Sequence, residues 1–135
     1  FRPIEQSSEK IKKNGRVNID LRLTSNPDIL AWAGAHKTAG QTLCGLAMET
    51  QDLESNAAKK LTSKHCSMLV ANNLNTPGAG FAVDTNVVTV LKPGETTDEP
   101  IIEHWNKMSK QELAERILTE LAALRNTESA ESQAS

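Results

Sequence analysis

Apolar and polar residues alternate between positions 17 and 24, where every second side chain is Val, Ile or Leu. A period of two is typical of a β-strand with one solvent-exposed face. Because an exposed apolar face needs a cover, we expect this segment to be an antiparallel arm through which the chain dimerises. Residues 1–16 are predicted to be a mobile flap, since Ile11 is the only apolar residue between Glu5 and Arg16.

Two nearly continuous apolar runs, at residues 41–48 and 66–71, are typical of strands that a parallel sheet buries on both faces. Between them, Leu53, Ala57 and Leu61 recur at helical spacing. Strand, helix and strand in this order predict a βαβ unit with a right-handed crossover. The fold class is therefore α/β, with a partial, Rossmann-like parallel sheet flanked by helices.

Further elements are predicted on both sides of this unit. Pro27 and Asp28 begin a helix that precedes the first apolar run, and residues 87–91 form another strand. A capping box of Ser109 and Glu112 opens the last helix. The chain after Asn126 is rich in Ser, Glu and Ala, so the folded domain spans residues 1–124 and residues 125–135 are expected to be a disordered tail.

Composition narrows the possible functions. The 135 residues include 15 Lys and Arg against 17 Asp and Glu, and aromatic residues are 3%. This balance argues against a general nucleic-acid surface or a base-stacking platform. No apolar run approaches the length of about 20 residues that a spanning helix needs. Cys44 and Cys66 lie in apolar segments, which indicates a reduced, cytoplasmic protein.

Spacing excludes several common sites. Gly40 and Gly45 have the interval of a phosphate-binding loop, but Leu46 and Ala47 stand where that loop needs Lys and Ser or Thr. The chain has no GxGxxG motif, and its Cys and His residues form neither a CxxC nor an HxxxH pair. We therefore expect no metal site built from this chain alone.

Lysines are the remaining candidates. Lys60 and Lys64 lie one helical turn apart, where they either compensate the helix dipole or bind a phosphate chain. Lys10, beside Lys12 and Lys13, belongs either to a solvated charge run or to a flap that closes over an anionic ligand. Pro27 to Leu30 form either an ordinary helix start or an anion site at a helix N-terminus.

These pieces occur in an order that resembles the C-terminal half of the phosphopantothenate–cysteine ligase domain. In bacteria that domain is usually fused behind a flavin-dependent phosphopantothenoylcysteine decarboxylase. The resemblance covers residues 1–124 and depends on several ordered motifs: Phe1-Arg2-Pro3, residues 9–13, residues 26–30, residues 45–50, Lys60 and Lys64, residues 70–72, and residues 81–90.

The resemblance implies a homodimeric ligase of coenzyme A biosynthesis that joins 4′-phosphopantothenate to L-cysteine. The bacterial type uses CTP with Mg²⁺ and passes through an acyl-cytidylate, whereas FMN belongs to the fused decarboxylase only. By the same resemblance, Lys10 is a catalytic flap residue, and the nucleotide is contacted by Lys10, Pro27, Asp28, Ile29, Leu30, Leu46, Lys60 and Lys64. Leu46 stands where the family has an aromatic residue, so the pocket wall stays apolar but lacks a ring.

The family's Gly-rich first half, and the Asn and Arg that handle its acyl intermediate, lie upstream of Phe1. We therefore expect the chain to be an incomplete, inactive fragment that accompanies the missing N-terminal half. Two alternatives remain at this point: a non-catalytic α/β interaction module that pairs through residues 17–24, and another type of nucleotide-binding domain. The sequence does not distinguish CTP from ATP.

Overall fold

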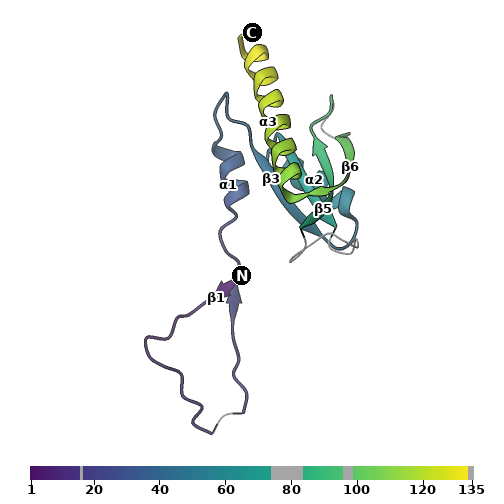
Figure 1. Ribbon diagram of the computed structural model, residues 1–135. Helices are drawn as coiled ribbons and strands as arrows, with labels where there is room; N and C mark the ends of the chain where they lie inside the picture. The colour runs from purple at the N-terminus through teal and green to yellow at the C-terminus, as the bar shows by residue number, and fades with distance from the viewer. Residues whose placement is uncertain (16, 74–83, 96–98, 134–135) are drawn as a thin grey trace.

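The computed structural model describes residues 1–15, 17–73, 84–95 and 99–133 (Figure 1). In chain order the elements are β1 (Arg2–Pro3), β2 (Leu23–Thr24), α1 (Ile29–His36), β3 (Cys44–Glu49), α2 (Leu53–Ser63), β4 (Met68–Asn73), β5 (Thr85–Lys92), β6 (Ile101–Ser109) and α3 (Lys110–Gln133). The α/β class is confirmed. No helix in these ranges is long and apolar enough to cross a membrane.

Four strands form the main sheet in the order β3-β4-β5-β6. The predicted βαβ unit is confirmed, because β3 and β4 pair in parallel and α2 connects them. β5 and β6 instead pair antiparallel with their neighbours. Strand β6 was not predicted, because it is an edge strand in which only Trp105 is buried, and its remaining side chains give no apolar pattern.

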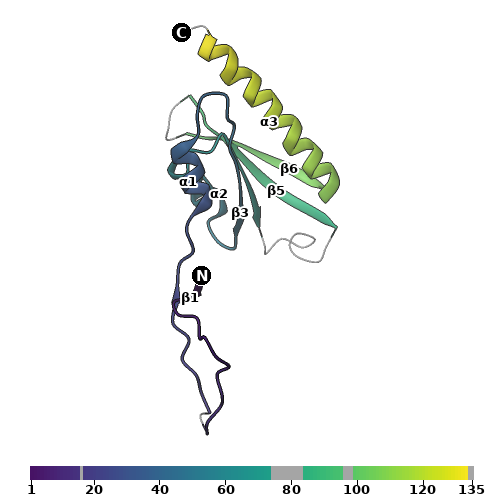
Figure 2. The same ribbon diagram turned by 90° about the vertical axis from the view of Figure 1, so that its left-hand side faces the viewer.

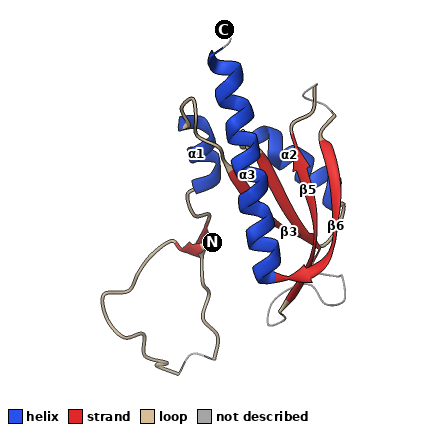
Figure 3. Cartoon of the chain, turned by 45° about the horizontal axis from the view of Figure 1, so that its top comes forward, coloured by secondary structure: helices blue, strands red, loops and turns tan. Residues whose placement is uncertain are grey.

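Helices cover both faces of this sheet, which gives three layers (Figures 2 and 3). On one face, α1 and α2 enclose a core built around Leu61, Leu69 and Leu91. On the other face, α3 packs Leu113 against Met68, Val90 and the rest of a second core. The sheet is therefore buried where both helical layers overlap.

Polar contacts fix α3 to the sheet. The Lys92 ammonium donates to Glu103 and to Glu120 on α3, each at 2.7 Å. Trp105 donates its indole N–H to Glu103 at 2.9 Å, and the Arg116 guanidinium lies 4.0 Å from the centre of the Trp105 ring. These contacts set the position of α3 over β5 and β6.

The capping box at the start of α3 is confirmed: the Ser109 hydroxyl accepts from the Glu112 N–H at 3.1 Å, and Glu112 accepts from the Ser109 N–H at 2.8 Å. The helix continues to Gln133, so residues 125–133 are described as helical, while the disorder expected from residue 125 stays a prediction. Ala and Glu have favourable helix propensities, which carry the helix beyond its packed part. Residues 134–135 lie outside the described part of the chain.

The arm, residues 1–26, extends away from the three-layered body (Figure 1). Its strands β1 and β2 pair antiparallel over two residues each, and only Leu23–Thr24 of the predicted strand 17–24 is β-structure. Residues 17–22 do not form a strand, because they lack a continuous partner and Val17 is 96% exposed. The mobility expected for residues 1–16 stays a prediction.

The close packing of α1 against the end of α2 at Gly34 predicts how a substitution there changes stability. A Cβ atom built at Gly34 would lie 1.8 Å from the Lys64 carbonyl oxygen, which belongs to the backbone and cannot turn aside. Helix propensity alone favours Gly34→Ala by about 1 kcal/mol. We expect the variant instead to lower the free energy of unfolding by about 2 kcal/mol, because overpacking of about 3 kcal/mol outweighs that gain.

Urea unfolding measures this change. The matched control is Ala35→Gly at the exposed neighbouring position, which loses only helix propensity, about 1 kcal/mol. A Gly34→Ala variant more stable than the parent protein would contradict the close packing of α1 on the end of α2.

Candidate functional site

Two lysines of α2 define the candidate site. Lys60 and Lys64 lie one turn apart at the C-terminal end of this helix, as their spacing predicted. Each ammonium group contacts a carboxylate from another element: Lys60 Nζ lies 2.5 Å from Glu49 Oε1, and Lys64 Nζ lies 2.5 Å from Asp28 Oδ2. The site therefore joins α2 to the end of β3 and to the start of α1.

Asp28 has two roles in this arrangement. As the N-cap of α1, its Oδ1 accepts from the Ala31 N–H at 2.9 Å, while its Oδ2 accepts from Lys64. The Lys64 ammonium, with help from the Ala31 N–H, lowers the pKa of the Asp28 carboxyl below its usual range. Asp28 is thus an ionised cap that fixes the start of α1 to the end of α2.

The other residues of the predicted helix start divide between core and surface. Leu30 packs against the first core, and its side chain faces Gly45 of β3. Pro27 and Ile29 are exposed beside Asp28. Of this segment, the structure brings Asp28 into contact with a site lysine and gives Leu30 a packing role.

Leu46 lies on the opposite face of β3 from the lysines. Side chains alternate along a strand. Gly45, Ala47 and Glu49 therefore face α1 and α2, whereas Leu46 projects to the side of α3, where it is 76% exposed. The structure does not bring Leu46 together with Lys60 and Lys64.

Asn72 is a candidate that the sequence analysis missed. It pairs in register with Met48 on β3, so it shares a sheet face with Leu46. It is 7% exposed, and within the described ranges its side-chain oxygen has no hydrogen-bond partner. A buried amide oxygen without a partner is costly, which marks a position for a ligand donor. An Asn inside an apolar strand was the available signal.

Lys10 lies in the exposed arm, outside the three-layered body (Figures 1 and 2). The described contacts of the arm are internal to it or reach only its own base, such as Arg2 to the Ser25 carbonyl oxygen at 2.7 Å. The structure therefore does not bring Lys10 to the α2 lysines.

Neither cysteine is suited to nucleophilic chemistry. Burial raises the pKa of the Cys44 thiol to about 11, and burial also raises that of Cys66. Both side chains remain protonated thiols at neutral pH. Among the described residues, no group of three or more His, Cys, Asp or Glu side chains is placed to hold a metal ion.

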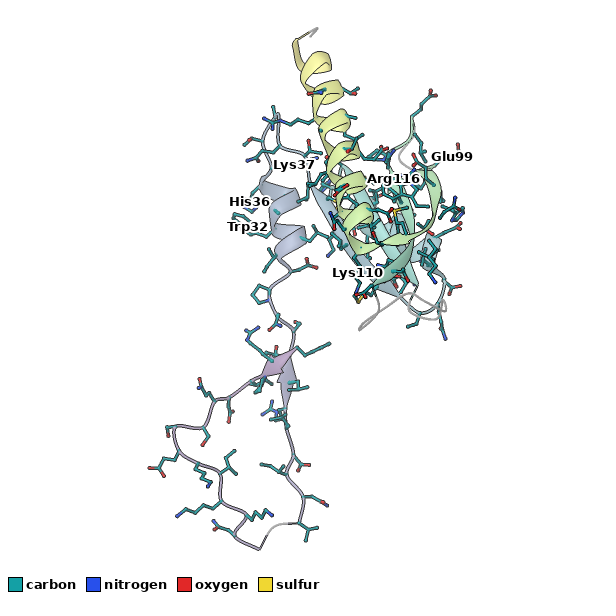
Figure 4. The ribbon with its side chains drawn as sticks, in the orientation of Figure 1. Trp32, His36, Lys37, Glu99, Lys110 and Arg116 are labelled. Atoms are coloured by element: carbon teal, nitrogen blue, oxygen red, sulfur yellow. The ribbon has the colours of Figure 1, made fainter. Side chains whose placement is uncertain are left out.

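Strand β3 is at one end of the sheet and has a free outer edge. Within the described part of the chain, no strand pairs with this edge, which is the end of the sheet. Beside it, Trp32 and His36 project from α1, and their rings stack with centroids 4.4 Å apart (Figure 4). A groove runs from these two residues past Leu43 to Leu121 and Arg125 of α3.

Comparison with known proteins identifies the domain. Residues 1–124 match the family described as the DNA/pantothenate metabolism flavoprotein C-terminal domain. The chain belongs to this family. The ligase-domain resemblance noted in the sequence is thereby confirmed.

Similar proteins agree with this assignment. The chain is 41% identical over 126 residues to the coenzyme A biosynthesis bifunctional protein CoaBC of Bacillus subtilis, with 92% of this chain and 29% of that protein covered. It is 37% identical to a cysteine/cysteine sulfinic acid decarboxylase from an unknown prokaryotic organism, with 92% and 33% covered. The chain thus spans about a third of the length of these curated relatives.

A solved structure of the C-terminal domain of a coenzyme A biosynthesis bifunctional protein CoaBC superposes with a TM-score of 0.62. Sequence identity is 28%, and the match covers 79% of this chain and 46% of that one. The fold described above is therefore that of part of this domain.

The Asp28–Lys64 pair predicts a pH dependence. Because the pKa of Asp28 is lowered in the folded chain, the pair stabilises the fold above the ordinary titration range of aspartate. That stabilisation is lost as the pH falls through the lowered folded-state pKa. Lys64→Met should raise the pKa of Asp28, because it removes the main cause of the shift.

Carboxyl ¹³C NMR titration of Asp28 measures this difference. Lys59→Met, at an exposed position of the same helix, should leave the titration unchanged. Identical Asp28 titrations in the parent and Lys64→Met proteins would show that the ion pair does not form in solution.

Proposed function

We propose that the chain is the C-terminal part of a ligase domain that acts in coenzyme A biosynthesis and joins 4′-phosphopantothenate to L-cysteine. Family membership and the names of the relatives support this role. The observation that carries the site assignment is the pair of ammonium groups one turn apart on α2, of which Lys60 is held by Glu49 and Lys64 by Asp28.

In this proposal Lys60 and Lys64 bind the phosphates of CTP. An ammonium group has three N–H donors, so each lysine keeps donors for phosphate oxygens after it contacts its carboxylate. Charge-assisted hydrogen bonds of this type are roughly twice as strong as neutral ones. The dipole-compensation alternative concerns helix stability only and is worth about 0.3–1 kcal/mol at an exposed helix end.

The reaction takes place in two steps. The carboxylate of 4′-phosphopantothenate attacks the α-phosphorus of CTP, so that pyrophosphate leaves and an acyl-cytidylate forms. The amine of cysteine then attacks the acyl carbon and CMP leaves. Lys10, carried by the arm, supplies positive charge as pyrophosphate develops, provided the arm closes over the site.

Mg²⁺ is proposed only as a companion of the triphosphate. The described residues offer no metal cluster, and the site carboxylates Asp28 and Glu49 both contact lysines. Mg²⁺ commonly binds through substrate phosphates with few protein ligands. In this proposal Mg²⁺ would therefore reach the site bound to the phosphates of CTP.

Leu46 is proposed as an apolar wall for the cytosine base, on the same face as the Asn72 oxygen, which has no hydrogen-bond partner among the described residues. This wall and the lysines lie on opposite faces of β3. A single nucleotide can contact both Leu46 and the lysines only if it extends around the end of β3 or around its free edge. The proposal that the nucleotide is CTP and not ATP rests on the family resemblance.

The N-terminal half of the domain is the proposed partner at that free edge. Parallel sheets are normally covered on both faces, and an unpaired strand edge offers backbone groups for pairing with another segment. The chain spans 46% of the solved relative, which provides the additional chain length. Docking along β3 and the groove at Trp32 would complete the sheet, so we expect no ligase activity from these 135 residues alone.

We also propose that the apolar side chains of the arm pair two copies of the protein. Val17→Asp with Ile19→Asp places charges on this apolar set and should convert a dimer to a monomer in sedimentation velocity of the complete protein. Asn18→Asp, at the polar position between them, is the control and should remain dimeric. A monomeric parent protein at micromolar concentration would refute arm-mediated pairing.

Lys60→Gln tests the phosphate assignment. Glutamine still offers Glu49 an N–H donor but has no positive charge, so folding should be nearly unaffected. Loss of a charge-assisted phosphate contact, about 1.5–3 kcal/mol, should raise the KM for CTP about tenfold or more in the complete enzyme. Lys59→Gln, on the same helix, is the control for charge alone, and equal KM values in the two variants would reject a specific contact.

Lys10→Gln tests the flap. An interaction that strengthens in the transition state affects turnover more than ground-state affinity. We expect most of the CTP affinity to remain, while pyrophosphate release in a single turnover slows by about 10²-fold, as for loss of one electrostatic stabiliser. Lys12→Gln is the control. Normal pyrophosphate release in Lys10→Gln would instead show that Lys10 is only part of a solvated run of charged residues.

A further inference from the structure

We infer that Glu49 is a positioning residue that holds the Lys60 ammonium in place for the nucleotide phosphates. The inference rests on the proposed function, because it concerns how Lys60 performs the assigned role. The Lys60 Nζ and Glu49 Oε1 atoms are 2.5 Å apart and join the end of β3 to α2.

Burial differs sharply between the two partners. The Glu49 side chain is 11% exposed, whereas that of Lys60 is 44% exposed. Glu49 is therefore the fixed member of the pair, and the ammonium lies between it and solvent. A carboxylate in that position is stabilised only while a cation or a donor remains beside it.

The backbone of Glu49 is also fixed. Glu49 is the last residue of β3 and pairs in register with Asn73 of β4. Side chains on strands hold a site more tightly than side chains on loops. The other site carboxylate, Asp28, is half exposed and is also occupied as the cap of α1, so it restrains Lys64 less strongly.

Positioning and competition predict opposite results. If Glu49 competed with phosphate for Lys60, its removal would tighten nucleotide binding. Lys60 uses one N–H donor for Glu49 and has two more, and its exposed fraction leaves them access to a ligand. A lysine that is already ordered loses less side-chain freedom on binding, so Glu49 should favour phosphate binding.

A double-mutant cycle in the complete enzyme tests this inference, with CTP as the varied substrate. Glu49→Gln alone should raise the KM for CTP about five- to tenfold with little change in kcat. In the Lys60→Gln background no cation compensates the negative charge of Glu49, which then repels phosphate. Removing that charge by Glu49→Gln should therefore leave the KM for CTP unchanged or lower it. A purely structural role of Glu49 would not give this background-dependent sign.

The matched control is Glu54→Gln, the same substitution at an exposed position in the first turn of α2. It should leave the KM for CTP unchanged. Glu49→Asp keeps the charge but retracts it by one methylene group, and it should give a smaller increase in KM than Glu49→Gln. This second variant keeps the test usable if Glu49→Gln folds poorly.

Two results would overturn the positioning role while leaving the proposed function intact. One is an equal increase in KM from Glu49→Gln in both backgrounds, and the other is a lower KM from Glu49→Gln alone. An unchanged KM in Lys60→Gln would instead overturn the phosphate role of Lys60 itself, and the Glu49 role with it.

Discussion

Parallel pairing of β3 with β4 is the constraint on which the rest of the structure depends. Two parallel neighbours cannot be joined by a short turn, so the chain must cross one face of the sheet, and α2 makes that crossing. The crossover fixes which side chains of α2 reach the end of β3. It places Lys60 against Glu49, and it brings the end of α2 to Gly34 of α1, where a glycine is required.

The elements predicted correctly are those with a strong local pattern. Two apolar runs around a helical repeat indicated the βαβ unit, and Ser109 with Glu112 indicated the start of α3. Strand β6 was missed because an edge strand with one buried residue has no apolar run. Residues 17–22 had the period of a strand, but the described chain gives them no continuous partner for their backbone.

In the candidate site, too, local relations were predictable from the sequence and long-range contacts were not. Helical spacing predicted that Lys60 and Lys64 lie together, because one turn is a local relation. Their carboxylates could not be predicted, since they are 11 and 36 residues away in the sequence. The alternation of side chains along β3 does separate Leu46 from Glu49, which was a usable signal once that strand was recognised.

In the proposed function, the Lys60–Glu49 and Lys64–Asp28 ion pairs are how a chain with a net charge of −2 would bind an anionic ligand. The net charge of the chain would not attract an anion, so binding would depend on a few ammonium groups that are held in a fixed arrangement before the ligand arrives. The strand that carries Glu49 at its end, β3, is also the strand with the free edge. Completion of the sheet and formation of the nucleotide site would then be a single event.

The most direct test of the account is a crystal structure of the complete protein with CTP bound. We predict phosphate oxygens within hydrogen-bond distance of both Lys60 Nζ and Lys64 Nζ, with Lys60 still in contact with Glu49. A CTP molecule bound elsewhere, with both lysines contacting only Glu49 and Asp28, would contradict the central claim.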